Sequence, residues 1–251
     1  MVGTLLMRGM LVGIVAGILC FGFLKIVGEP QVDHAIAFEA AMDEAKEKGQ
    51  AEFAPEPELV SRSVQAGVGL FTGVTVYNAA FGGLFALVFA LAYRRMGDLS
   101  PRATSALLAA AGVIAIYVVP NLKYPANPPS IGAPDTIGMR TELYFVMIAI
   151  SLAAMIGAGM LRRRLNPRYG SWNAALIAAA AYLTVMIVVS LALPSVNETP
   201  EGFPAVVLWQ FRIASAGAQL IMWTTIGLMF GALTERAATR QNDSRLKATA
   251  L

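Results

Sequence analysis

The chain has 251 residues, of which 57% are hydrophobic and only 14% are charged, and its formal net charge is +3. Soluble proteins carry about 25% charged residues, so this composition and the mean hydropathy of +0.61 predict an integral membrane protein and exclude a soluble domain. The basic residues form no separate basic domain, so nucleic acid is not an expected partner. The single cysteine, Cys20, excludes an intrachain disulfide.

Six apolar stretches follow one another along the chain, and each is long enough to cross a hydrocarbon core of about 30 Å as a helix. They predict an all-α fold, a polytopic transmembrane helix bundle that forms one integral membrane domain over residues 1–251. The first stretch is expected to remain as an anchor helix, because no small-residue cleavage site follows it. The stretches cover residues 4–26, 64–92, 103–119, 143–161, 174–193 and 205–233.

Basic residues gather in every second connection between these stretches, whereas acidic residues outnumber them in the other connections. The positive-inside rule therefore places both termini, including the tail at residues 234–251, in the cytoplasm. The lipid bilayer is the first expected partner. The residues on the basic side are Arg8, Arg94, Arg95, Arg102, Arg162, Arg163, Arg164, Arg168, Arg236, Arg240, Arg245 and Lys247.

Small residues recur at helical spacing in three of the stretches. Such stripes allow helix backbones to approach closely in a bilayer, where packing drives association. We expect them to pack helices within this chain, and a dimer interface is the alternative, so a homo-oligomer is left open. The stripes are Gly9, Gly13 and Gly17, then Gly69 and Gly73, then Gly227 and Gly231.

The first outer connection, residues 28–62, is an acidic loop that is expected to contain a helix over residues 31–48, with a stop at Gly49 and an N-cap for the next helix at Ser61. Acids spaced four apart and the only histidine fall on this helix, and nitrogen and oxygen donors suit a borderline divalent ion. The candidate metal ligands are Glu29, Asp33, His34 and Glu39. The alternative is the solvated face of a surface helix.

The second outer connection, residues 120–141, begins with a run that is expected to be too rich in proline to be helical. It predicts a rigid polar structure at the outer mouth, either facing a substrate or acting as a structural plug. Asp135 is expected to pair with Arg140, and Lys123 with Glu142 or the first-loop acids. The candidates for a transport path or outer gate here are Asn121, Lys123, Tyr124, Asn127, Asp135, Arg140 and Glu142.

Two polar residues inside the stretches complete the candidate path. Arg212 lies about eight residues into the last stretch, where an ionisable group is costly and indicates function. Glu142 is its expected partner, and snorkelling beside Trp209 is the alternative. Asn78, in the second stretch, is expected either to form an interhelical hydrogen bond or to belong to the path.

Several of these segments together resemble the CbtA family of predicted cobalt transporter subunits, over nearly the whole chain. The most specific part is the Lys-Tyr-Pro-Ala-Asn-Pro-Pro run at residues 123–129. The remaining parts are Gly28-Glu29-Pro30, Ser61-Arg62 with Gln65, Asn121-Leu122, and residues 135–141 leading into Leu143-Tyr144-Phe145.

The resemblance implies a bacterial cytoplasmic membrane protein for cobalt uptake, with Co²⁺ as the transported ion and a small single-span, histidine-rich CbtB protein as partner. Family descriptions usually give five spans, whereas charge and hydropathy here favour six.

The sequence has no Walker-type phosphate loop, no flavin or nicotinamide fingerprint and no nucleophile with a base partner, so we expect neither an enzyme nor a permanently bound cofactor. An acidic outer face would concentrate cations at the mouth. Two alternatives remain open. One is a scaffold subunit that conducts nothing, and the other is a membrane-embedded enzyme or anion-binding protein that uses Lys123, Tyr124, Asp135, Arg140 and Arg212.

Overall fold

The computed structural model describes residues 2–47, 60–129, 131–132 and 136–249. All regular structure in these ranges is helical, which confirms the predicted all-α fold. The elements are α1 (Val2–Phe23), the π-helical turn η1 (Leu24–Gly28), α2 (Glu29–Glu47), α3 (Arg62–Val64), η2 (Gln65–Gly69), α4 (Leu70–Ala92), α5 (Pro101–Gly112), η3 (Val113–Val118), α6 (Val119–Lys123), α7 (Ile137–Ala192), α8 (Ala205–Thr225), η4 (Ile226–Phe230) and α9 (Gly231–Thr249).

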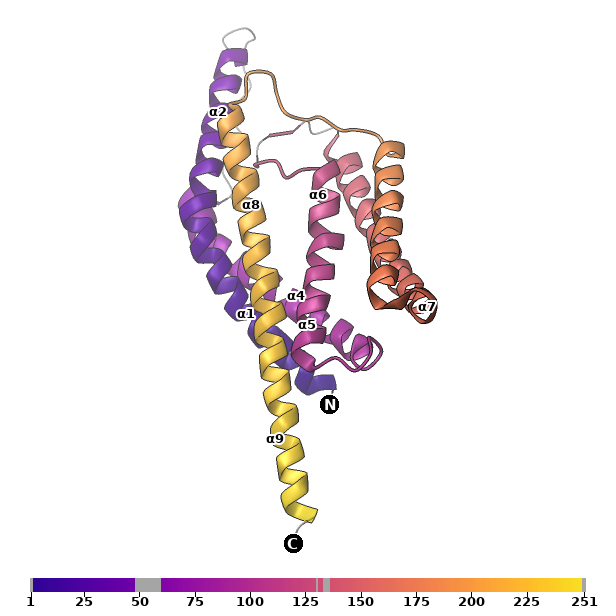
Figure 1. Cartoon of the computed structure of the whole chain (residues 1–251). Helices are drawn as coiled ribbons and strands as arrows, with labels where there is room; N and C mark the ends of the chain where they lie inside the picture. The colour runs from indigo at the N-terminus through magenta and orange to yellow at the C-terminus, as the bar shows by residue number, and fades with distance from the viewer. Residues whose placement is uncertain (1, 48–59, 130, 133–135, 250–251) are drawn as a thin grey trace. The chain divides into compact units, whose positions relative to one another are not determined.

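Two of the prolines inside helices lie just after a π-helical turn. Pro30 follows η1, and α1, η1 and α2 form one curved rod (Figure 1). Pro120 follows η3, and the helix continues to Lys123. A proline has no N–H and its ring crowds the carbonyl four residues earlier, and the wider π turn accommodates both effects.

The helix expected over residues 31–48 is therefore confirmed as α2, while its stop at Gly49 lies outside the described residues. The expectation that the run beginning at Pro120 is not helical is wrong for residues 120–123, which lie in α6, and holds for residues 124–129. The predicted loop, which extended to residue 141, gives way to α7 already at Ile137. Ser61 takes the N-cap position of α3 with an extended backbone, but its hydroxyl contacts the Ser63 hydroxyl at 3.1 Å and makes no capping bond.

The expected single domain, residues 1–251, divides into two compact units. Unit 1 comprises Met1–Ala110 and Trp209–Leu251, and unit 2 comprises Ala111–Leu208. Each unit contains its own buried residues and its own polar contacts.

In unit 1, the glycine stripe of α1 packs directly against α4. A Cβ added to Gly9 or Gly13 would overlap the backbone carbonyl of Gly82 or Asn78, and one added to Gly17 would lie 2.7 Å from the Cα of Thr75. The predicted packing of helices within the chain is thus confirmed for α1. Since a side chain at any of these positions would separate the helices, the close contact depends on glycine.

The other two stripes behave differently from each other. Gly227 and Gly231, in η4 and α9, pack against Ala109 and Ser105 of α5, and the Ser105 hydroxyl donates to the Gly227 carbonyl at 2.6 Å. Gly73 of α4 instead faces open space within the described structure. Only part of the small-residue pattern therefore contributes to internal packing.

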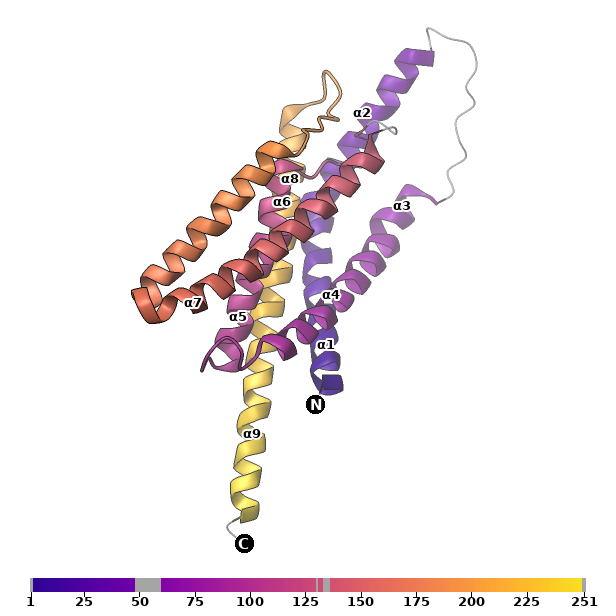
Figure 2. The same ribbon diagram turned by 90° about the vertical axis from the view of Figure 1, so that its right-hand side faces the viewer.

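In unit 2, α7 is a helical hairpin. Gly170 has φ 75° and ψ 165°, a left-handed conformation that breaks the helix and favours glycine. The hydroxyls of Ser151 and Tyr182 are 2.8 Å apart, although on a straight helix they would be separated by roughly 46 Å. The two arms, joined by a sharp bend in Figure 2, bury Met147, Tyr182 and Met186 together with Tyr124.

Five helices in the described ranges are long and apolar enough to cross a membrane. The 56-residue α7 contains two of the six predicted stretches, 143–161 and 174–193, one on each arm of its hairpin. The connection expected between these stretches, residues 162–173, contains the turn at Gly170, although the helix continues through residues 162–168 before it. The predicted tail is helical as far as Thr249, where α9 ends.

Candidate functional site

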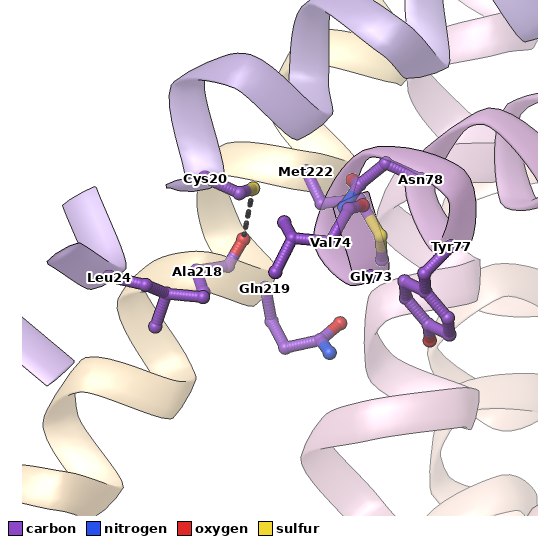
Figure 3. Close-up of a pocket in the computed structure, with 9 residues that line it drawn as sticks. All are labelled: Cys20, Leu24, Gly73, Val74, Tyr77, Asn78, Ala218, Gln219 and Met222. Atoms are coloured by element: carbon purple, nitrogen blue, oxygen red, sulfur yellow. Dashed lines mark hydrogen bonds between the residues drawn. The ribbon is translucent and has the colours of Figure 1, made fainter. Parts of the chain in front are cut away.

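Unit 1 contains a cavity of about 190 Å³ between α1 with η1, α4 and α8. Its lining combines apolar groups with two sulfur atoms and two amide side chains, as Figure 3 shows. The lining residues are Cys20, Leu24, Gly73, Val74, Tyr77, Asn78, Ala218, Gln219 and Met222.

Asn78 is the most constrained polar group of this cavity. Its side chain is buried, with 3% of the residue exposed, because Gly13 allows α1 to lie directly on the α4 backbone at this level. The Asn78 Nδ2 donates to the Val74 carbonyl of its own helix at 2.8 Å. This bond lies within α4, so it is not the interhelical hydrogen bond that was one of the two expectations for Asn78. The Oδ1 atom has no hydrogen-bond partner among the described residues. An unsatisfied buried acceptor costs about 1–3 kcal/mol.

Two buried sulfur atoms face the same cavity from other helices. Cys20 of α1 and Met222 of α8 are each 2% exposed. The Cys20 thiol donates to the Ala218 carbonyl of α8 at 3.3 Å (Figure 3). Sequence reasoning missed both residues as site candidates, because their positions differ by about two hundred and neither belongs to a recognisable motif.

At one end of unit 1, Arg62 closes an ion-pair cluster with two of the predicted metal ligands. Its guanidinium pairs with Glu29 and with Asp33, the latter at 2.9 Å, while Lys25 donates to the Ala66 carbonyl at 3.0 Å. These contacts tie α2 to the start of the next membrane-length helix. A metal ion on Glu29 and Asp33 would have to displace the arginine.

The other two predicted ligands lie further along α2, where His34 is exposed and Glu39 is half-buried. Within the described ranges, no three His, Cys, Asp or Glu side chains gather closely enough to hold a metal ion. Metal binding by Glu29, Asp33, His34 and Glu39 therefore remains a prediction from the sequence.

At the opposite end of unit 1, contacts join α1 and α5 to α9. The Arg8 guanidinium donates to the Thr234 hydroxyl at 3.1 Å, and Arg102 pairs with Glu235 at 2.8 Å. Arg8 and Arg102 thus lie at one end of this unit, and the Glu29, Asp33 and Arg62 cluster lies at the other.

In unit 2, a buried carboxylate organises the loops. The Glu198 side chain is 1% exposed, and its Oε2 accepts from Arg140 at 2.7 Å while its Oε1 accepts from the Thr136 hydroxyl at 2.8 Å. Arg140 also donates to the Pro125 carbonyl at 2.6 Å. We call these four residues the loop clamp. Glu198 was missed at the sequence level, because nothing distinguishes it from an ordinary loop acid.

The proline-rich run is fixed by further contacts in unit 2. The Tyr124 hydroxyl donates to the Pro194 carbonyl at 2.8 Å, and burial raises the pKa of this phenol, which keeps it protonated as a donor. The Asn121 Oδ1 accepts from the Ala126 N–H at 3.1 Å, which folds the chain after α6. Lys123 donates to the Ser195 hydroxyl at 3.1 Å.

Within the described part of unit 2, Lys123 thus bonds to Ser195 and makes no ion pair with Glu142, which corrects one of its two expected pairings. Its pairing with the first-loop acids, which belong to unit 1, stays a prediction. The predicted partner of Arg140, Asp135, lies outside the described residues. Asn127 is half-buried in the loop, and Glu142 is exposed near the start of α7. Arg212 is half-buried on α8 in unit 1, whereas Glu142 belongs to unit 2, so their pairing stays a prediction.

Residues 2–235 match the family model described as "Probable cobalt transporter subunit (CbtA)". No curated protein and no solved structure gives a significant match.

Proposed function

The chain belongs to the CbtA family of probable cobalt transporter subunits, and on that premise we propose that it carries Co²⁺ across a bacterial cytoplasmic membrane. Both termini would lie in the cytoplasm, because the positive-inside rule favours that side for the basic ends of the helices. A small single-span, histidine-rich CbtB-like subunit would deliver the ion, since His34 is the only imidazole of this chain.

The observation that carries the proposal is the cavity of unit 1. Its helices are apolar enough for a membrane, yet they enclose the Asn78 amide oxygen without a partner among the described residues. Polar groups inside membrane helices face substrate and ion pathways, because hydrocarbon cannot satisfy them. An ion or its water shell would provide the missing partner.

Charge placement supports inward movement of a cation. The acids of α2 would lie at the outer end of the path and raise the local cation concentration. An inside-negative potential favours entry of a divalent ion by about 4.6 kcal/mol per 100 mV. Net uptake therefore requires no nucleotide-hydrolysing domain in this chain.

The loop clamp favours one alternative for unit 2. Arg140 and Lys123 are engaged by Glu198 and Ser195, so these cations serve internal structure. This supports a scaffolding role for unit 2 and weakens the proposal of an anion-binding site that uses the same residues.

Reconstitution tests the function directly. The full-length chain, with and without its partner, is placed in liposomes, and entry of radioactive Co²⁺ is followed under an imposed inside-negative potential. We expect uptake that rises with the potential and that falls in Asn78→Leu. Asn173→Leu is the matched control, because Asn173 makes the same bond to the carbonyl four residues earlier, to Tyr169 at 3.1 Å, on the exposed surface of α7. Absence of flux with the partner present at every potential would leave the scaffold alternative.

A further inference from the structure

We infer that the cavity of unit 1 is itself a transition-metal site, in which the Cys20 sulfur, the Met222 thioether and the Asn78 amide oxygen bind the ion. The inference rests on the proposed function only for the role of that ion as cargo. The three donors lie on α1, α8 and α4 and line one cavity (Figure 3).

Asn78 provides the evidence that is independent of sulfur. Asn78 lines the cavity and is only 3% exposed, and its Nδ2 donates to the Val74 carbonyl. Its Oδ1 has no hydrogen-bond partner among the described residues. The hydrogen bond to Val74 fixes the amide plane, so the oxygen is presented as an acceptor. A cation in the cavity would satisfy it.

The neighbouring polar groups are less suited to be ligands. Gln219 lines the cavity, but its Oε1 already accepts from the Trp223 indole N–H at 3.2 Å. Tyr77 is 51% exposed and lies at the edge of the site. The donors that remain are two sulfurs and one amide oxygen.

This donor set selects a chemical class of ion. Thiolate and thioether sulfur favour soft and borderline transition metals over Mg²⁺ or Ca²⁺, which prefer oxygen alone. A volume of about 190 Å³ exceeds the roughly 30 Å³ occupied by one water several-fold, so a hydrated ion fits. Three protein ligands with water in the other positions also allow release, which conduction requires.

Protons balance as follows. A divalent ion binds the Cys20 sulfur in place of the thiol proton, and that proton passes to water. The hydrogen bond from the Cys20 thiol to the Ala218 carbonyl is then lost. The bound state carries one net positive charge, and one proton is released per ion, so binding strengthens as the pH rises.

The experiment uses the purified full-length chain in detergent, titrated with Co²⁺. Coordination by thiolate gives a near-ultraviolet sulfur-to-metal charge-transfer band, and because Cys20 is the only cysteine, the band reports this site alone. Bound Co²⁺ should also slow alkylation of Cys20 by a maleimide, measured by mass spectrometry, whereas Mg²⁺ should not.

Variants assign the ligands. We expect Cys20→Ser to abolish the band, and Met222→Leu and Asn78→Leu each to weaken Co²⁺ binding by about tenfold or more, the scale seen when groups that support a metal are removed. Met147→Leu is the matched control for Met222→Leu, because Met147 is equally buried, at 1% exposed, but packs in unit 2.

The outcomes separate this inference from the proposed function. No band and no protection of Cys20, in a wild-type chain that still transports Co²⁺, would overturn the site and leave transport standing. A band with ligand-dependent affinity but no flux in liposomes would support the site and overturn transport. Equal affinities for Met222→Leu and Met147→Leu would remove Met222 from the ligand set even if the Cys20 variant failed to fold.

Discussion

A single buried carboxylate determines how the loops of unit 2 are held. Glu198 has a side chain that is 1% exposed, and a charge in such a place requires a compensating cation. Arg140 provides it from 58 positions away in the chain, with a second donor bond to the Pro125 carbonyl. The proline-rich run is thus fixed by an ion pair and not by its prolines alone.

Removal of the arginine should therefore destabilise the protein. We expect Arg140→Met to lower the free energy of unfolding by roughly 3–5 kcal/mol, because it leaves Glu198 buried without a counter-charge. Thermal unfolding in detergent and the abundance of the protein in membranes measure the loss.

The double variant Arg140→Met with Glu198→Gln should recover part of that stability, since the uncompensated charge is then gone. Arg164→Met, at an exposed position on α7, is the control and should unfold like the wild type. Equal melting temperatures for Arg140→Met and Arg164→Met would show that the clamp contributes no stability.

At the scale of elements, the contact between α1 and α4 determines the site. Gly13 of α1 brings the α4 backbone so close that Asn78 is buried. Cys20 lies two turns further along α1. Glycine therefore has a positional role here, because it sets the separation of two of the helices that form the cavity.

We expect Gly13→Leu to separate α1 from α4. Overpacking of this kind typically costs about 1–3 kcal/mol, and here the added side chain meets backbone, which cannot move aside. The melting temperature should fall, and Cys20 should react faster with a maleimide because its burial depends on this contact.

Gly22→Leu provides the control on the same helix, since nothing lies within 4 Å of a Cβ at that position. It should match the wild type in both measurements. If Gly13→Leu also did so, the packing of α1 on α4 would not be the source of the burial.

The proline-associated π turns are a second feature of the elements. The hydropathy pattern located the apolar helices, but it predicted that they end before Pro30 and Pro120. In the structure, helix continues from α1 through η1 into α2, and from η3 into α6. The reason is that a π turn removes the clash at a proline without ending the helix. The pattern of apolar residues contains no signal for this.

At the scale of the whole molecule, the distribution of charge predicts how the chain lies in a bilayer. In unit 2, the arginines near the Gly170 turn and the loop clamp mark opposite ends of the α7 hairpin. The positive-inside rule predicts that the turn faces the cytoplasm.

Labelling with a membrane-impermeant maleimide checks this orientation. We expect Asn197→Cys to react in intact cells and Arg164→Cys to react only after permeabilisation, since both positions are exposed on unit 2. The native chain is the background control, because Cys20 is 2% exposed. Equal reaction of both variants in intact cells would overturn the predicted topology.

The sequence by itself determined the helical class, the six apolar stretches, the glycine contact of α1 and the family, because these depend on composition, periodicity and local motifs. It also singled out Asn78, Arg140 and Tyr124 as candidates for the transport path, and that role stays a prediction. It could not find the partners of Asn78 in the cavity, Cys20 and Met222, and it missed Glu198 as the partner of Arg140.

Only the tertiary structure decided those groupings, for a physical reason. The Cys20 thiol bonds to Ala218 across 198 positions, and Arg140 to Glu198 across 58. Such contacts depend on which helix faces and loops are brought together by packing, and a sequence pattern read along one helix does not carry that information. The predicted connection at residues 162–173 contains the turn of α7, but only the backbone of Gly170 shows where the helix reverses.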